Sequence, residues 1–195
     1  ANESDLTGEW TITTTTSNTF SAVATGVANT TGTGTKTAKA APLGWSKVFS
    51  GTNKAVYRSN DPTSTGMYLR VDDTGTNSGR VVGYEAMTDV DTGTGPFPTT
   101  SQVSGGLYWT KSVLANTTAR LWKLFGTSKK FDFFPRVDSP SNTVRHYPFG
   151  DFVSEKQGDA YQCLLAGDSA YVGGAGLGAI GNNNFQASDL YAPRS

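Results

Sequence analysis

Apolar and polar residues alternate most regularly between Gly66 and Pro98. Met67, Leu69 and Val71 fall on one face of a strand, because side chains that are two residues apart point to the same side. The alternation returns at 80–86, after about eight turn-forming residues, which predicts a β-hairpin with a long loop. Glycine and proline in 88–98 predict an irregular segment after the hairpin.

The same pattern predicts strands along most of the chain. Two adjacent runs, 118–125 and 130–134, are joined by a Gly-Thr-Ser turn and predict a second hairpin. With about eight to ten strands and no amphipathic helix, we expect an all-β fold, an antiparallel β-sandwich of the jelly-roll or lectin-like kind. Further strands are predicted at 9–13, 19–23, 53–58, 105–111 and 158–166.

Shifts in composition divide the chain into three parts. Residues 1–42 form a small β module, which we interpret as the end of a truncated N-terminal domain because the chain begins without methionine inside a strand-like pattern. A low-complexity run before Pro42 marks the first boundary. Residues 43–166 form the sandwich, and 167–195 read as a Gly/Asn-rich extended arm that docks on a neighbour.

The composition shows that the chain carries few charged residues. Charged residues make up 16% of the chain, with 16 basic and 16 acidic residues, and 23 glycines together with many threonines replace them. A neutral chain gives no electrostatic reason to expect nucleic acid or a membrane surface as partner. No apolar run approaches the ~18 residues of a membrane helix. A weakly charged surface suits a homo-oligomer.

Residues that could carry chemistry are few. The only cysteine, Cys163, excludes an internal disulfide and a Cys-based zinc site, and its apolar neighbours indicate a buried thiol. The acidic turns 72–75 and 89–93 resemble calcium loops, but both lack the third oxygen ligand and the final Glu. Asx-turns explain both segments, so we expect no metal ligands.

Catalytic arrangements are also poorly supported. His146 is the only histidine and Asp151 could orient it, but no nucleophile elbow is present. Glu85 and Asp89 are the nearest approach to a carboxylate pair for glycoside hydrolysis. A G-x-G-x-x-G match at 176–181 lacks the strand, helix and acidic residue of a nucleotide site. We therefore expect a non-enzymatic protein without catalytic or cofactor-binding residues.

Carbohydrate binding is the alternative that stays open. Sandwich folds present exposed aromatic residues to sugar rings, and Trp45, Trp109 and Trp122 are the candidates. Tryptophan in an alternating strand is more often part of the core.

Three segments carry a resemblance to known proteins. The wording of GWSKVFSGTNKAVYRS, YLRVDDTGTNSGRVVGYEAMTDVDTGTGPFPT and FGDFVSEKQGDAYQCLLAG resembles an uncharacterised family of tailed-bacteriophage virion proteins, over about residues 5–165. Members of that family look longer at both ends. The segment LTGEWTIT…FSAVATGV also looks like the end of a small β module common in phage structural proteins. The family offers no catalytic residues to transfer.

The resemblance implies a place in a virion. We expect a structural protein that decorates the capsid or forms part of the tail or neck, with other virion proteins as partners. The alternative is a glycan-binding receptor-recognition module of a phage tail, with a host surface glycan as ligand.

Overall fold

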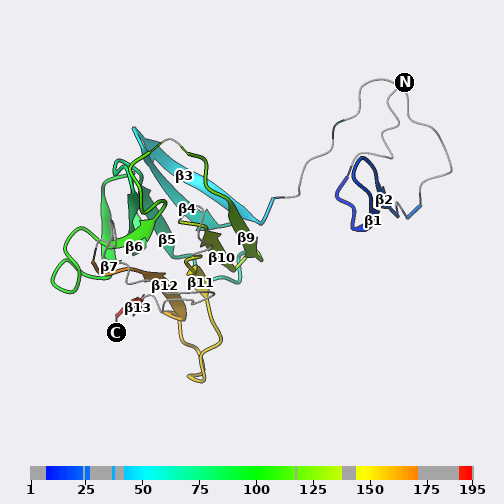
Figure 1. Cartoon of the computed structure of the whole chain (residues 1–195). Helices are drawn as coiled ribbons and strands as arrows, with labels where there is room; N and C mark the ends of the chain where they lie inside the picture. Colours follow the sequence, from blue (N-terminus) through cyan, green and yellow to red (C-terminus); the bar gives the residue numbers. More distant parts are fainter. Residues whose placement is uncertain are drawn as a thin grey trace. The chain divides into compact units, whose positions relative to one another are not determined.

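The structure is a computed structural model that describes residues 8–23, 25–26, 37, 42–116, 118–137, 144–170 and 189–194 (Figure 1). The chain divides into two compact units, Ala1–Pro42 and Leu43–Ser195. Every regular element in the described ranges is a β-strand, and all strand pairs are antiparallel. The prediction of an all-β sandwich fold is therefore confirmed.

The first unit contains one short hairpin. Strands β1 (Ile12–Thr15) and β2 (Phe20–Ala22) pair through a turn in which the Thr16 amide donates to the Thr19 carbonyl at 2.8 Å. Every residue of the two strands is exposed. This is expected, since two strands alone cannot bury an apolar face.

A six-stranded sheet begins the second unit. The predicted hairpin at 66–98 is confirmed as β5 paired with β6, with Leu69 opposite Gly83 and Val71 opposite Val81. Strands β7 and β8 lie one after the other along the free edge of β6. The strands are β3 (Trp45–Gly51), β4 (Lys54–Ser59), β5 (Tyr68–Asp72), β6 (Ser78–Met87), β7 (Gly93–Phe97) and β8 (Leu107–Thr110).

Strand β7 corrects the prediction of an irregular segment at 88–98. Pro96 has no backbone N–H to donate, and an edge strand tolerates this because its outer side needs no partner. Phe97 and Pro98 are fully buried, so both are core residues. The Phe97 ring occupies the space where a side chain at Gly83 would lie, which explains the glycine in the middle of β6.

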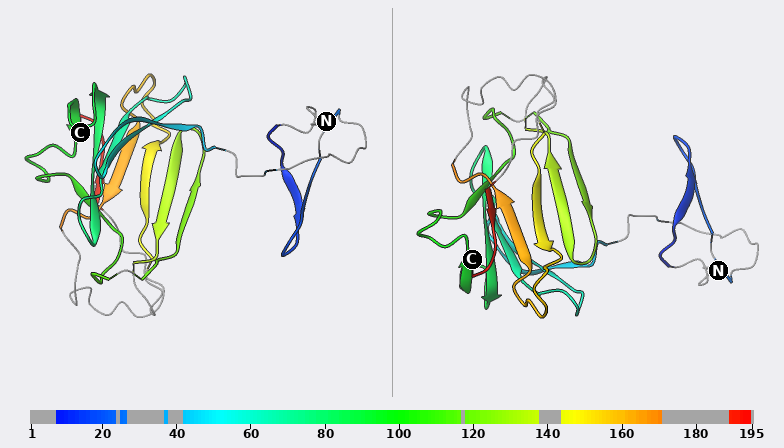
Figure 2. Two further views of the ribbon diagram at one scale, coloured as in Figure 1. Left: turned by 90° about the horizontal axis from the view of Figure 1, so that it is seen from above. Right: turned by 90° about the horizontal axis from the view of Figure 1, so that it is seen from below.

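A five-stranded sheet forms the second layer, and Figure 2 shows β9 to β12 side by side, from yellow-green to orange. The predicted second hairpin is confirmed as β9 and β10. The sequence did not predict β11, and the strand expected at 158–166 begins only at Cys163. The spatial order is β13 (Asp189–Tyr191), β12 (Cys163–Gly167), β11 (Tyr147–Asp151), β10 (Lys130–Pro135) and β9 (Trp122–Gly126).

The final strand differs from the expected C-terminal arm. Asp189–Tyr191 pairs with β12 as an edge strand, and the Arg194 guanidinium reaches the Glu85 carboxylate with two contacts of 2.8 Å. The end of the chain is therefore attached to the sandwich. The rest of the predicted arm, 171–188, lies outside the described residues.

The core lies between the two sheets. Leu69, Val81 and Phe97 of the six-stranded sheet meet Phe149 and Leu165 of the five-stranded sheet, and all five are almost completely buried. Burial of apolar area at about 25 cal/mol per Å² is the main force that holds the layers together.

Candidate functional site

The two long edges of the sandwich differ in how they are closed. At one edge, which we call the closed edge, β8 meets the end of β12. The Tyr108 amide donates to the Asp168 carbonyl at 2.8 Å, and the Asp168 amide donates to the Tyr108 carbonyl at 3.0 Å. Trp109 Nε1–H donates to the Ala166 carbonyl at 2.7 Å. Hydrogen bonds therefore join the two sheets directly at this edge.

A buried polar cluster reinforces the closed edge. The Asp168 carboxylate accepts hydrogen bonds from the Tyr147 hydroxyl at 2.7 Å and from the Thr110 hydroxyl at 3.3 Å. Burial first, and the nearby Asp168 charge second, raise the pKa of Tyr147 well above its ordinary value. The Tyr147 hydroxyl therefore keeps its proton and remains a hydrogen-bond donor to Asp168. The Thr110 amide donates to the hydroxyl oxygen at 3.0 Å.

Arg145 supplies the balancing charge. Its Nη1 lies 3.7 Å from the Asp168 carboxylate, and the side chain is about 1% exposed. Its Nε and Nη2 are buried without a hydrogen-bond partner among the described residues. The Asp168 carboxylate is thus the one counter-charge of the buried Arg145 cation among the described residues. Removing one partner of such a buried pair strongly lowers the stability of the fold.

Among the described residues, the opposite edge, between β3 and β9, is joined at one end only. The turn after β9 is fixed to the other sheet, where Trp45 Nε1–H donates to the Thr127 carbonyl at 2.9 Å. Ser128 Oγ–H donates to Asp61 Oδ2 at 2.8 Å, and the Ser59 hydroxyl donates to the Ser128 carbonyl. We call these contacts the clasp.

Asp61 is the charged member of the clasp. The Thr63 hydroxyl and amide both donate to Asp61 Oδ1, at 2.7 and 2.8 Å. These hydrogen bonds, followed by the one from Ser128, lower the pKa of Asp61 to about 2.

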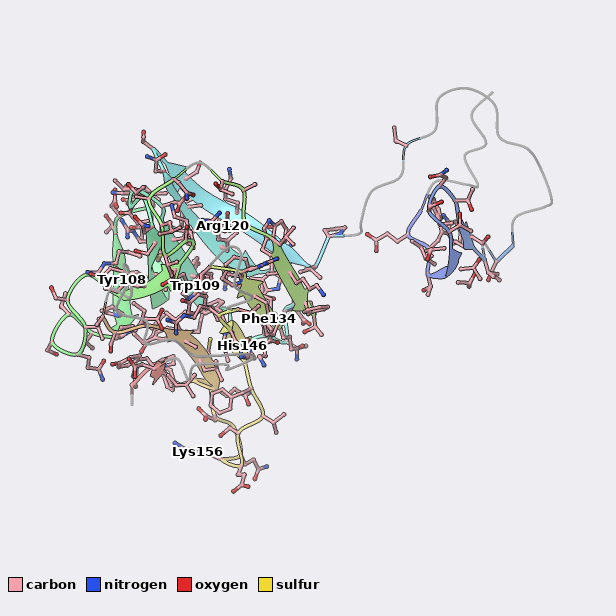
Figure 3. All side chains as sticks on the ribbon, viewed as in Figure 1. Tyr108, Trp109, Arg120, Phe134, His146 and Lys156 are labelled. Atoms are coloured by element: carbon pink, nitrogen blue, oxygen red, sulfur yellow. The ribbon has the colours of Figure 1, made fainter. Side chains whose placement is uncertain are left out.

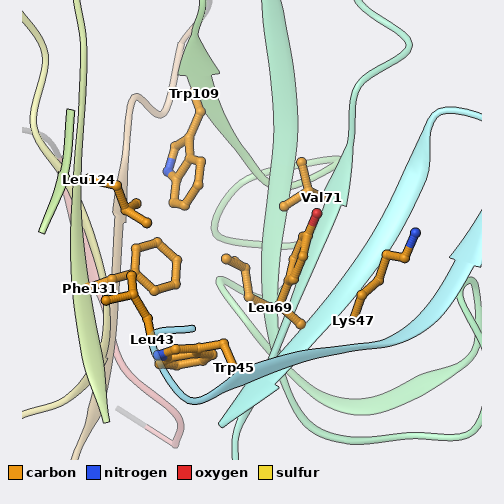
Figure 4. Close-up of a pocket in the computed structure, with 9 residues that line it drawn as sticks. Leu43, Trp45, Lys47, Leu69, Val71, Trp109, Leu124 and Phe131 are labelled. Carbon is orange, nitrogen blue, oxygen red and sulfur yellow. The ribbon is translucent and has the colours of Figure 1, made fainter. Parts of the chain in front are cut away.

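Beyond the clasp, an open cavity lies between the two sheets (Figure 4). Its volume is about 430 Å³, within the range of ligand sites. Leu124 and Phe131 stand on one side, Leu69 and Val71 on the other, with Trp109 between them. The lining residues are Leu43, Trp45, Lys47, Tyr57, Leu69, Val71, Trp109, Leu124 and Phe131.

Few polar groups face this cavity. The indole N–H groups of Trp45 and Trp109 are already bound to backbone carbonyls. The Lys47 ammonium and the Tyr57 hydroxyl are the other polar side-chain groups of the lining, and neither has a hydrogen-bond or ion-pair partner in the described part of the chain. The cavity therefore suits an apolar group with an acceptor beside it.

Strand β9 continues this cavity as an exposed apolar edge. It is the last strand of its sheet, and its side chains are exposed at every position. Trp122 is 65% exposed and Phe125 57%, and the preceding Leu121 is 70% exposed. Leu124 lines the cavity, and Trp122 shares its face of the strand. We call the cavity and β9 together the open edge.

The backbone of β9 also has one side with no partner among the residues that the structure describes. Thr127 is hydrogen-bonded to Lys130, and Leu121 to Arg136, in the ladder with β10. Bonded positions alternate along an antiparallel strand, so Lys123 and Phe125 also bond to β10. The N–H and C=O groups of the residues between them, 122, 124 and 126, consequently point away from the sheet.

The acidic turns proposed from the sequence are Asx-turns. Asp72 Oδ1 accepts from the Thr74 amide at 3.1 Å, and Asp89 Oδ1 accepts from the Asp91 and Thr92 amides at 2.7 and 2.9 Å. Backbone hydrogen bonds contribute to a lowered pKa at both carboxyls. Within the described ranges, no cluster of three or more His, Cys, Asp or Glu could hold a metal ion.

The two residues weighed for catalysis, His146 and Asp151, do not contact each other. His146 Nε2 lies 2.7 Å from Asp132, not Asp151, and the ring stacks on Phe134 at a centroid distance of 4.5 Å (Figure 3). Asp151 instead accepts from the Thr65 amide at 2.8 Å. The arrangement considered from the sequence, in which Asp151 orients His146, is therefore not formed.

The remaining candidates are accounted for individually. The Glu85 carboxylate forms an ion pair with the Arg194 guanidinium, and the Asp89 carboxylate accepts a hydrogen bond within its own turn. Cys163 is about 1% exposed, and burial raises its pKa above the ordinary value, so the thiol is buried as predicted. The glycine motif at 176–181 lies outside the described residues.

The three tryptophans proposed for sugar binding have different environments. Trp109 is buried, Trp45 packs against Phe131 at 5.2 Å between ring centroids, and only Trp122 stands on an open surface. The sequence did not predict the open edge as a unit. The available signal was the run 121–125, Leu-Trp-Lys-Leu-Phe, which is apolar on both faces of a single strand.

Comparison of the chain with known protein families, with curated proteins and with solved structures gives no match. The resemblance to phage virion proteins stays a prediction. None of the described residues forms a helix long and apolar enough to cross a membrane.

Proposed function

We propose that this chain is a non-enzymatic structural protein of a bacteriophage virion, which decorates the capsid or forms part of the tail or neck by packing against other subunits. The observation that carries the proposal is the open edge. An edge strand with free backbone groups and exposed Trp122 and Phe125 is a ready surface for another protein.

The form of the open edge supports assembly over catalysis. Most edge strands are protected from other chains by prolines, bulges or inward charges. Strand β9 has no proline, pairs with β10 in an unbroken register and has Lys123 as its only charged residue. A strand of this kind is best explained by a partner that covers it in the mature assembly.

The alternative is a glycan-binding receptor-recognition module. Trp122 offers an exposed ring, and Trp45 and Trp109 line the cavity. Sugar sites also need several convergent hydrogen-bonding side chains, and the cavity offers only Lys47 and Tyr57. Subunit packing is therefore the better supported role.

The test is to look for the chain in purified particles. Virions of the phage that encodes the chain are purified from a host lysate on a density gradient. They are then analysed by mass spectrometry and by gold-labelled antibodies in the electron microscope. We expect the chain at constant stoichiometry in the particle band and label at one place on the particle. If the chain stays in the soluble fraction, the proposal fails.

A further inference from the structure

We infer that the open edge binds an extended segment of another protein, in which apolar side chains alternate with acidic ones, and that this segment adds as a new strand to β9. The inference rests on the proposed function for the source of the partner, another virion protein. It names the chemistry of the partner and the atoms that hold it.

The backbone of β9 selects an extended partner over a helix. The free N–H and C=O groups of Trp122, Leu124 and Gly126 repeat at every second residue, which is the spacing of a β-ladder. A helix satisfies its own backbone groups and would leave these unpaired. A strand would form main-chain hydrogen bonds with them, as in other cases of β-strand addition.

The side chains of β9 select apolar anchors. Trp122 and Leu124 share the inner face, and Leu124 opens directly into the 430 Å³ cavity. A strand paired with β9 would place alternate side chains on this same face. One of its apolar side chains would enter the cavity, and the next would cover the Trp122 ring, so alternating apolar residues fit the groove.

Charges around the groove select acidic residues. Lys123 lies in β9, Arg120 precedes it, and Lys47 lines the cavity from the opposite sheet. None of the three has a carboxylate partner among the residues that the structure describes. Arg120 donates only to the Thr118 carbonyl and the Asn116 amide oxygen.

This charge pattern disfavours a second copy of β9 as the occupant. Pairing β9 with its own copy would bring two Lys123 side chains and two Arg120 side chains to one short interface, and like charges on neighbouring strands are destabilising. A segment with carboxylates between its apolar residues would instead place them beside Lys123, on the outer face of β9. Electrostatic complementarity of this kind raises specificity and association rate.

The first experiment measures peptide binding to the full chain. A fluorescein-labelled peptide of about ten residues, a usual strand length, alternates valine with glutamate and is followed by fluorescence anisotropy. Control peptides replace glutamate with lysine, or keep the composition but group the valines together. We expect saturable binding of the alternating acidic peptide below about 1 mM, the weak end of specific affinity, and at least about tenfold weaker binding of both controls.

Two variants at one position separate backbone from side-chain contributions. Trp122→Val keeps the outward N–H group, whereas Trp122→Pro removes it without touching the ladder to β10. We expect about threefold weaker peptide binding for Trp122→Val and about thirtyfold for Trp122→Pro, since main-chain hydrogen bonds give affinity in strand addition. Lys123→Glu should weaken the acidic peptide and strengthen the lysine peptide.

Amide hydrogen exchange by NMR gives a readout that needs no variant. In the free protein we expect fast exchange at residues 122, 124 and 126 and slow exchange at 123 and 125, because only the latter bond to β10. Saturating acidic peptide should slow the three fast amides. Equal binding of all peptides, or no protection of these amides, would overturn the inference.

The outcomes also separate this inference from the proposed function. A chain that is present in particles but does not bind the acidic peptide would leave the virion role standing and remove the strand-binding site. A chain that binds the peptide as expected but is missing from particles would leave the strand-binding site standing and remove the virion role.

Discussion

The closed and open edges of the sandwich use similar residues for opposite purposes. Each has a tryptophan and an arginine, Trp109 and Arg145 at the closed edge and Trp122 and Arg120 at the open edge. At the closed edge the indole donates to a carbonyl of the other sheet and the guanidinium meets a buried carboxylate. At the open edge the indole is 65% exposed and the guanidinium contacts only its own loop.

Residue type does not determine the role of a side chain at these edges; the presence or absence of a facing strand does. Strand β8 is covered by β12, so its polar groups must find fixed partners and contribute to stability. Strand β9 has no described neighbour beyond it, so its apolar groups contribute little to folding and are free for binding. Trp109 also lines the cavity, so the separation of stability from binding concerns strands β8 and β9 and not the whole of each edge.

Replacing the two tryptophans tests this separation most strongly. Trp109→Ala removes a buried ring that stacks on Tyr147 at 5.6 Å, together with the hydrogen bond to the Ala166 carbonyl. We expect a loss of about 4 kcal/mol in the free energy of unfolding. Trp122→Ala should change it by less than about 0.5 kcal/mol, because the ring is mostly in water already.

Urea unfolding of the full chain, followed by circular dichroism, measures both changes. The separation of roles would be disproved if the two variants lost similar amounts of stability. Trp122→Ala should still bind the acidic peptide more weakly than the wild-type chain, so its effect appears in binding rather than folding.

Removing one charge at the closed edge should have the next largest effect. Asp168→Asn keeps one carbonyl oxygen, which can accept from both Tyr147 and Thr110, but leaves the Arg145 cation buried without a counter-charge. We expect a loss of about 3 kcal/mol, typical of a broken buried ion pair. Thermal and urea unfolding provide the measurement.

Asp132→Asn is the matched control, because Asp132 pairs with His146 on the outer face, where both side chains are partly exposed. Asp132→Asn should lower the free energy of unfolding by less than about 1 kcal/mol. A cost for Asp168→Asn as low as that of the control would mean that water already reaches Arg145.

Much of the fold was predictable because alternation and turn residues act locally. The pattern in Met67, Leu69 and Val71 predicts which face of β5 is buried, and Met67 and Leu69 are core residues as that pattern requires. Strand β7 was missed because its glycines and Pro96 violate strand propensity, and only the free outer side of the edge position makes them acceptable.

The candidate site was harder to predict because it depends on contacts far apart in sequence. The polar cluster joins Thr110, Arg145 and Asp168, which no local motif links. His146 pairs with Asp132 and not with Asp151, although Asp151 is nearer in sequence. The pairing of β10 with β11 places His146 and Asp132 on the same face of the sheet. The exposure of β9 follows only from the strand order, which alternation along a single strand cannot reveal.

The smallest expected effect is at the clasp, where stability should depend on pH. The folded pKa of Asp61 is about 2, below its ordinary value of 3.8, chiefly because Thr63 donates to the ionised carboxylate. A depressed pKa contributes stability that is complete above the ordinary value and is lost as the pH falls through the folded value. Acid should therefore release Ser128 and loosen the end of the open edge.

The measurement compares the thermal midpoint of the wild-type chain with that of Asp61→Asn as the pH falls from 3.8 to about 2. Other carboxylates titrate in the same range and affect both proteins, so the difference between the two isolates the clasp. We expect the wild-type advantage to shrink over this interval, with faster amide exchange at the β9–β10 turn. An advantage that does not change with pH would show that Asp61 contributes no charge-dependent contact, and that Trp45 and Ser59 hold the turn in place.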